Sequence, residues 1–321
     1  MGSGDFLRKG AQTPFLEHFV MAGVPGSIAT NSESILAAAR GCFWPVGTPS
    51  REPRVRLRFW VDPKGSSQPP WPKPFFRGLN HLIFAGFDSQ NSVLVDLHSC
   101  RAIGRFSPAM GDHLDSWKTV IFPVLVSMMG ATVGITELHC GCVAREGSGL
   151  LLAGGSGSGK STLALALAQA GFSYLSDDRT YLFAGQAGIA AWGLPTLLKL
   201  RLDAADWFNE LEDLRRASAS KGEQALWIDP VRNLGLERTQ RCEPKSLVFL
   251  QRQEHSTFDL CAMSPDQAAK HLEADLMAEE PEAAEGQRGM IANLVKLPCW
   301  QLKHGGAPQA VARLLESRLL R

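Results

Sequence analysis

One short segment of the chain combines glycines, a lysine and a serine at a spacing that suits phosphate chemistry. Glycines let a backbone curl so that successive N–H groups point at phosphate oxygens, and the positive end of a following helix adds to the attraction. A lysine then meets the terminal phosphates, and the hydroxyl after it is a ligand for Mg²⁺. The alternative is a chance glycine- and serine-rich loop. The segment fits G-x-x-x-x-G-K-[ST] and consists of Gly154, Gly155, Ser156, Gly157, Ser158, Gly159, Lys160 and Ser161, with Thr162 directly after it.

Two adjacent carboxylates, Asp177 and Asp178, follow at the end of the next predicted strand, 17 residues after Lys160. Beside a phosphate loop, one such carboxylate can hold Mg²⁺ directly or through water, and the other can accept the proton of an attacking hydroxyl. Two close negative charges also raise the pKa of one carboxyl, which favours a base. The alternative is that one or both only cap a turn at the strand end.

A histidine precedes the loop and stands in a cysteine-containing run. His139 lies 15 residues before Gly154 and can orient or share a transferred proton, although a lone histidine is more often structural. The run continues as Cys140-Gly141-Cys142, which suggests a metal site. No second Cys/His cluster completes four ligands, so we expect no zinc.

Four cationic residues further along are candidates for contacting an anionic substrate. Lys199 and Arg201 are able to stabilise transition-state charge, or they form a solvated strand edge. Arg232 and Arg238 follow Asp229 in a loop-like stretch, where exposed arginines are common.

The phosphate loop needs a strand before it and a helix after it, and the sequence supplies both. Residues 149–153 are a short apolar run typical of a buried strand. Residues 161–170 are an Ala/Leu segment of high helix propensity, closed by Gly171. A second strand at 172–175 completes a strand–helix–strand unit with a right-handed crossover.

The remaining pattern divides the chain into a mixed α/β region, 1–135, and a catalytic region, 136–321. The first region carries no catalytic constellation; we expect it to recognise substrate or to complete the fold. Residues 65–74 are rich in Pro and Ser and predict a loop, and residues 278–287 predict an exposed loop or frayed helix. The other predicted elements are strands at 55–61, 81–87, 92–97, 246–250 and 300–302, and helices at 34–40, 112–129 and 307–320.

Composition excludes several classes of protein. The 321 residues are 45% apolar and 20% charged, which excludes wholesale disorder. Thirty-three basic against 32 acidic residues give a net charge of +1, too balanced for a nucleic-acid or membrane-surface partner. The longest apolar run, 120–135, falls short of the ~20 residues that span a bilayer and predicts a core helix. Seven scattered cysteines and no apolar leader indicate the cytoplasm.

The segment from His139 to Asp178 resembles the catalytic domain of bacterial HPr kinase/phosphorylase. That family has a histidine at the same distance before its loop, a G-x-S-G-x-G-K-S loop, and an Ala-Asp-Asp strand end where Ser176-Asp177-Asp178 stands here. The resemblance is close over about 40 residues and looser over the C-terminal half. It implies a phosphoenolpyruvate-carboxykinase-like P-loop fold. It also implies Asp177 as the base, Asp178 near the metal with Ser161, His139 assisting, and Lys160 on the phosphates.

The chain also departs from that family's pattern. Its first third does not resemble the family's accessory domain, and Lys199 and Arg201 stand where the family's later signature has an acidic residue. The chain is thus more similar to a divergent HPr-kinase-related group found with peptide-modification genes, so neither phosphorylase activity nor HPr as the target is carried over.

The sequence therefore predicts a kinase that uses ATP and Mg²⁺ to phosphorylate a Ser or Thr hydroxyl on a peptide or small protein; a homo-oligomer is compatible with it. A small-molecule kinase and an ATP-binding regulator without a transfer target remain as alternatives. An ABC-type ATPase would need an LSGGQ-like signature and a GTPase an N-K-x-D motif, and the sequence contains neither.

Overall fold

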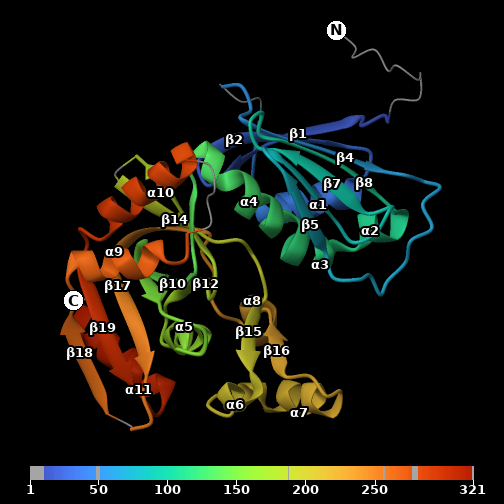
Figure 1. Cartoon of the computed structure of the whole chain (residues 1–321). Coiled ribbons are helices and arrows are strands. Elements are labelled where there is room, and N and C mark those ends of the chain that lie inside the picture. Colours follow the sequence, from blue (N-terminus) through green and yellow to red (C-terminus); the bar gives the residue numbers. More distant parts are fainter. Residues whose placement is uncertain (1–10, 48–50, 187, 256, 277–280, 320–321) are drawn as a thin grey trace. The chain divides into compact units, whose positions relative to one another are not determined.

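The chain folds into two compact units, Met1–Val133 and Gly134–Arg321, each built on one large mixed sheet with helices (Figure 1). The structure is a computed structural model, and it describes residues 11–47, 51–186, 188–255, 257–276 and 281–319. The protein is therefore of the mixed α/β class, and each unit is described on its own.

The sheet of the first unit has eight strands in the order β3-β1-β2-β4-β8-β7-β6-β5. The pairs β2–β4 and β4–β8 are parallel, and the other neighbours are antiparallel. The strands are β1 (Phe15–Met21), β2 (Val24–Thr30), β3 (Trp44–Val46), β4 (Val55–Val61), β5 (Phe75–Leu79), β6 (Leu82–Gly86), β7 (Ser92–Asp96) and β8 (Arg101–Phe106).

Helices lie along one side of this sheet (Figure 1). Helix α1 (Glu33–Cys42) begins where the Ser32 side chain accepts a hydrogen bond from the Ile35 N–H and so caps the helix. It is followed later by α2 (Pro108–Asp112), α3 (Leu114–Ser116), a π-helical turn η1 (Trp117–Ile121), α4 (Phe122–Gly130) and the 3-10 turn η2 (Ala131–Val133).

The predicted helix 112–129 is broken at its start, because the chain turns at His113 between α2 and α3. The stretch Leu114–Val133 has a mean hydropathy of 1.3 and is long and apolar enough to cross a membrane by length and composition alone. Half of it is buried within the protein. Trp117 is fully buried against Phe59 and Phe106, which are inward residues of β4 and β8.

The second unit is built around the long strand β17, which pairs in parallel with both β11 and β19. At its first residues β17 also pairs with β14, which joins β14, β13 and β9 to the same sheet. Its strands are β9 (Thr136–Leu138), β10 (Cys140–Arg145), β11 (Ser148–Ala153), β12 (Ser173–Ser176), β13 (Thr180–Gly185), β14 (Gly188–Trp192), β17 (Arg241–Arg252), β18 (Phe258–Ala262) and β19 (Cys299–His304).

Helices cover both faces of this sheet (Figure 1). Along β11, Leu150 and Leu152 point into a core with α5 (Lys160–Gln169) and α11 (Pro308–Leu319). Leu151 points into a second core with α9 (Pro265–Glu273) and α10 (Pro281–Leu294). A strand buried on both faces reads as a continuous apolar run, which is the pattern of 149–153.

A smaller substructure, residues 198–234, packs into the core that contains Leu150 and Leu152. Strands β15 (Leu198–Arg201) and β16 (Ala225–Ile228) pair as an antiparallel two-stranded sheet. The connecting and following elements are α6 (Leu202–Ala205), η3 (Asn209–Leu211), α7 (Glu212–Ser220) and α8 (Pro230–Leu234).

Two sequence-based expectations change in this unit. Strand β10 lies between β11 and β12 and is antiparallel to both, so the predicted strand–helix–strand unit spans an inserted strand. For 278–287 the sequence left an exposed loop or a frayed helix open; the loop is wrong from residue 281 onward, because these residues begin the helix α10. Ala283, Gln287 and Ile291 recur every four residues and form its buried stripe. Residues 278–280 lie outside the described residues.

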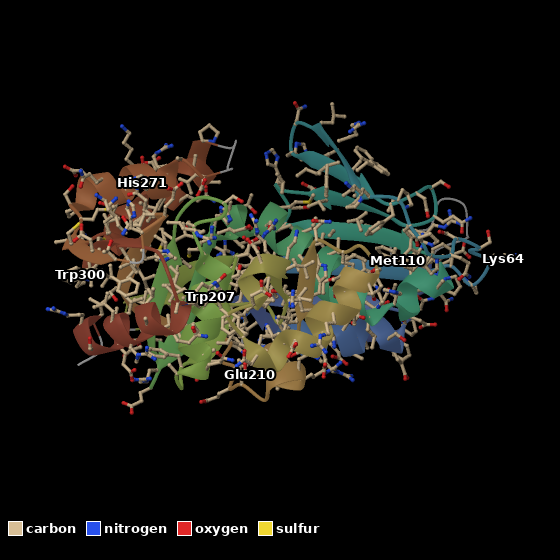
Figure 2. All side chains as sticks on the ribbon, turned by 90° about the horizontal axis from the view of Figure 1, so that it is seen from below. Lys64, Met110, Trp207, Glu210, His271 and Trp300 are labelled. Carbon is tan, nitrogen blue, oxygen red and sulfur yellow. The ribbon has the colours of Figure 1, made fainter. Side chains whose placement is uncertain are left out.

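We expect Trp117→Ala to lower the free energy of unfolding of the protein by about 3–5 kcal/mol, because it empties a closed aromatic core. It also removes the 2.9 Å hydrogen bond that the Trp117 indole N–H donates to the carbonyl oxygen of Met110, a residue labelled in Figure 2. Ile103→Ala is the matched control: Ile103 is 56% exposed, so its loss should change stability by at most about 0.5 kcal/mol. Urea unfolding followed by circular dichroism measures both, and equal effects would contradict the assignment of this core.

Candidate active site

The phosphate loop connects the end of β11 to the start of α5, as the sequence predicts. Gly154 and Gly159 have φ angles of 143° and 98°, which disfavour residues with a side chain. A Cβ at Gly154 would also lie 2.7 Å from the carbonyl oxygen of Leu250 on β17. The curled backbone and the helix start therefore fit the requirements of a phosphate-binding loop.

Lys160 is held inside this loop. Its Nζ donates to the carbonyl oxygens of Gly154 at 2.7 Å and Gly155 at 3.4 Å. Burial lowers the pKa of the ammonium group, and the negative charges of Asp178 and other nearby acids oppose that shift. The lysine thus places a positive charge at the loop from within the protein.

Asp177 is a buried carboxylate, 4% exposed, with three donors around it. Its Oδ1 accepts from the Tyr174 hydroxyl at 2.8 Å, its Oδ2 faces the backbone N–H of Lys199 at 3.4 Å, and Ser161 of the loop also hydrogen-bonds to it. Burial raises the pKa of Asp177; the charge of Asp178 also raises it, and the donors lower it. Burial likewise raises the pKa of Tyr174, which stays a donor.

Asp178 points the other way and pairs with His139. The Asp178 side chain is 60% exposed, and its Oδ1 lies 3.0 Å from His139 Nε2. The other ring nitrogen of His139 is 3.9 Å from Asp275 Oδ2, and Arg179 Nε is 3.9 Å from Asp178 Oδ2. A histidine between two carboxylates at an accessible edge is suited to handling a proton.

Sheet pairing explains why residues 39 positions apart meet here. His139 stands at the junction of β9 and β10, next to Leu138, which pairs with Thr180 of β13. The Thr180 hydroxyl also donates to the Cys140 carbonyl oxygen at 2.9 Å. These contacts fix the chain on both sides of His139 against Thr180, two residues after Asp178.

His304, at the end of β19, contacts the phosphate loop, and sequence reasoning missed it. Its Nε2 lies 2.9 Å from the carbonyl oxygen of Ser158, so the ring N–H donates to the loop. Burial lowers the pKa of His304, which keeps the ring neutral with one N–H. No motif marks this histidine in the sequence; the parallel pairing of β19 with β17 brings it to the loop end of the sheet. Tyr174 and Asp275 were missed for the same reason.

The predicted cations are distributed around the site rather than gathered in it. The backbone N–H of Lys199 faces the Asp177 carboxylate, while the Lys199 Nζ lies 5.3 Å from the ring of Trp227. Arg238 donates to two backbone carbonyls at 3.0 and 3.1 Å and lies over the Tyr174 ring, so it supports the donor of Asp177. Exposed pairs are formed by Arg201 with Asp203 at 3.0 Å and by Arg232 with Asp229 at 3.7 Å.

The cysteines next to His139 point into the core. Burial raises the pKa of Cys140 to about 12, and Cys142 Sγ lies 3.6 Å from Cys242 Sγ. Within the described ranges, no group of three or more His, Cys, Asp or Glu side chains is arranged to hold a metal ion.

The raised pKa of Asp177 has a consequence for stability. A carboxyl whose folded pKa exceeds its ordinary value destabilises the fold once it ionises, and that cost disappears as the pH falls below 3.8. Asp177→Asn keeps an acceptor for Tyr174 and removes the charge. We expect it to raise Tm by a few degrees at neutral pH and to lose that advantage near about pH 3. Asp259→Asn, which removes a carboxylate at an exposed strand position, is the control; a lower Tm for Asp177→Asn at neutral pH would contradict the argument.

Comparison with known proteins adds a distant resemblance of fold. No protein-family model matches the chain, and no curated protein matches it. Among solved structures, the chain is similar to the HPr(Ser) kinase/phosphatase from Coxiella burnetii, with a TM-score of 0.33 and 11% sequence identity. The match covers 58% of this chain and 97% of that one. This is a fold-level similarity to a kinase, and no residue role is taken from it.

Proposed function

We propose that the protein is an ATP- and Mg²⁺-dependent kinase that phosphorylates a Ser or Thr hydroxyl of a peptide or small protein. The observation that carries this proposal is that two adjacent carboxylates beside the same phosphate loop make different contacts. Asp177 is bonded to the loop residue Ser161, and Asp178 is paired with His139 at an accessible edge. A protein that only binds ATP would need the first arrangement but not the second.

The residues of the loop fit a nucleotide. Ser158 Oγ is buried and has no hydrogen-bond partner among the described residues, so it is available to an incoming phosphate oxygen. Ser161 with Asp177 is a donor set of the kind Mg²⁺ uses, since this ion binds one or two carboxylates together with substrate phosphates. When bound, Mg²⁺ would neutralise phosphate charge. A phosphoenolpyruvate-carboxykinase-like P-loop fold is the finer assignment that we propose for this unit.

The contacts favour roles for the two aspartates opposite to those that the family resemblance implies. Asp177 is buried and bonded to the metal-ligating serine, so we assign it to the metal. The Asp178 side chain is accessible to the hydroxyl that accepts the phosphate, and its contact with His139 orients it, so we assign it as the base. The neighbouring charge of Lys160 then meets the phosphates.

The transfer step follows from these positions. The acceptor hydroxyl oxygen forms a bond to the γ-phosphorus of ATP while the bond from that phosphorus to the β–γ bridging oxygen breaks. ADP leaves with the electron pair of that bond. The hydroxyl proton passes to Asp178, and the hydrogen bond from His139 holds the carboxylate in place. Positioning and charge neutralisation supply most of the catalysis.

We also propose the cytoplasm as the compartment, where ATP, Mg²⁺ and reduced cysteines are available. The first unit is free of the proposed catalytic residues, and we propose that it contributes to recognising the acceptor.

The test is phosphate transfer from γ-labelled ATP with Mg²⁺, first by the protein alone and then with a lysate fractionated by size. Label in macromolecules supports the proposal, label in small metabolites supports a small-molecule kinase, and neither supports a regulator. We expect Asp178→Asn to lower kcat about 10²–10⁴-fold, and Lys160→Ala to abolish transfer nearly completely. Asp259→Asn is the matched control with unchanged transfer. Near-normal transfer by Asp178→Asn would overturn the base assignment, and by Lys160→Ala the site itself.

The contact of His304 with the loop predicts an effect on ATP binding. His304→Ala removes one donor to the Ser158 carbonyl, which should raise KM for ATP about tenfold with kcat little changed, because the loop binds ground and transition states alike. His304→Gln, which keeps a donor, should recover most of the affinity. His271→Ala, an exposed histidine on α9 (Figure 2), is the control. A fall in kcat without a change in KM would contradict this role.

A further inference from the structure

The first unit presents one face of its sheet that none of its described helices covers. Side chains paired across the strands share this face, and one row runs across seven strands. Parallel rows on either side pair Arg56 with Arg101 and Trp60 with Arg105. We call these three rows the open face. The central row is Leu16, Ala29, Arg58, Ile103, Leu94, Phe84 and Arg77.

The open face has an excess of unpaired positive charge. Arg105 lies 2.6 Å from Asp62, and Arg56 lies 3.6 Å from Glu52. By contrast, within the part of the chain that the structure describes, no carboxylate lies within 4 Å of three of its guanidinium groups. These belong to Arg58, Arg77 and Arg101.

Apolar side chains stand between these arginines. Ile103 lies directly beside Arg58 across the strands and is more than half exposed, and Phe84 and Phe75 are each exposed by about two fifths. They line a hollow of about 590 Å³ together with Arg58 and Trp60. The strands of a sheet normally place polar residues on the face that meets solvent. A contiguous apolar area on that face therefore indicates a binding surface.

We propose that the open face binds an acidic, extended segment of a partner protein, in which carboxylates alternate with apolar side chains. The unpaired guanidinium groups complement the carboxylates, and Ile103, Phe84 and Trp60 complement the apolar positions. A nucleic acid suits the face less well. The balanced net charge of the chain gives no overall basic excess to attract a phosphate backbone.

The experiment measures fluorescence anisotropy of short labelled synthetic peptides with the full chain. One peptide alternates Glu with Leu and Phe, a second carries Lys in place of Glu, and an oligouridine RNA is the third probe. We expect the Glu peptide to bind, with an affinity that falls as salt rises. Arg58→Glu with Arg101→Glu should weaken it about tenfold, while Arg313→Glu on α11 of the other unit should leave it unchanged.

Each other outcome overturns the proposal. It is wrong if the Glu peptide does not bind, if the Lys peptide or the RNA binds as tightly, or if the arginine reversals leave binding unchanged. Thermal unfolding of each variant shows that it is folded; if the double variant is not, Ile103→Ser, which removes only an exposed apolar contact, takes its place with an expected loss of a few fold. The measurement uses no ATP, so it stands or falls independently of the proposed kinase activity.

Discussion

The candidate site depends on a backbone conformation that the phosphate loop cannot maintain alone. A loop with several positive φ angles and inward N–H groups needs outside contacts to hold it. Three neighbouring strands supply them. The Leu250 carbonyl of β17 leaves room only for glycine at position 154, His304 of β19 binds the Ser158 carbonyl, and Asp177 after β12 binds Ser161. The loop is thus held by the neighbouring strands together with the hydrogen bonds that Lys160 donates within it.

The bend that follows β12 separates the two aspartates. Both residues lie in this bend rather than in a strand, and their side chains meet different surroundings. Asp177 turns into the core beneath the loop, where Tyr174 supplies a donor, and Asp178 turns toward His139 and solvent. In the proposed mechanism, this one dipeptide would therefore supply both the metal ligand and the proton acceptor.

Local patterns predicted the parts of the fold in which the chain itself carries the signal. The alternation at 55–61 became β4, the Ala/Leu run became α5, and the glycine-rich loop lies between β11 and α5 as expected. What the sequence did not reveal depends on pairing over long distances. Strand β10 is short and contains cysteines and a glycine, so its place between β11 and β12 has no local signature.

The site shows the same limit. Lys160, Ser161 and the aspartates were found because motifs hold them at fixed spacing. His304 and Asp275 reach the site only through the pairing of β19 with β17 and the packing of α9, which no spacing encodes. The assignment of roles to Asp177 and Asp178 likewise needed their surroundings, since the residue types are identical.

The two sheets of this chain differ in a way that bears on their tasks. Strand β11 is apolar at every central position, and helices bury it on both faces, so its contribution is a rigid frame for a loop at its end. Strand β8 alternates strictly between buried and exposed residues, and its exposed positions are Arg101, Ile103 and Arg105. A strand that is buried on only one face needs polar residues of any kind on its exposed face. The fold does not require an exposed isoleucine between Arg101 and Arg105, and the proposed binding of a partner would account for it.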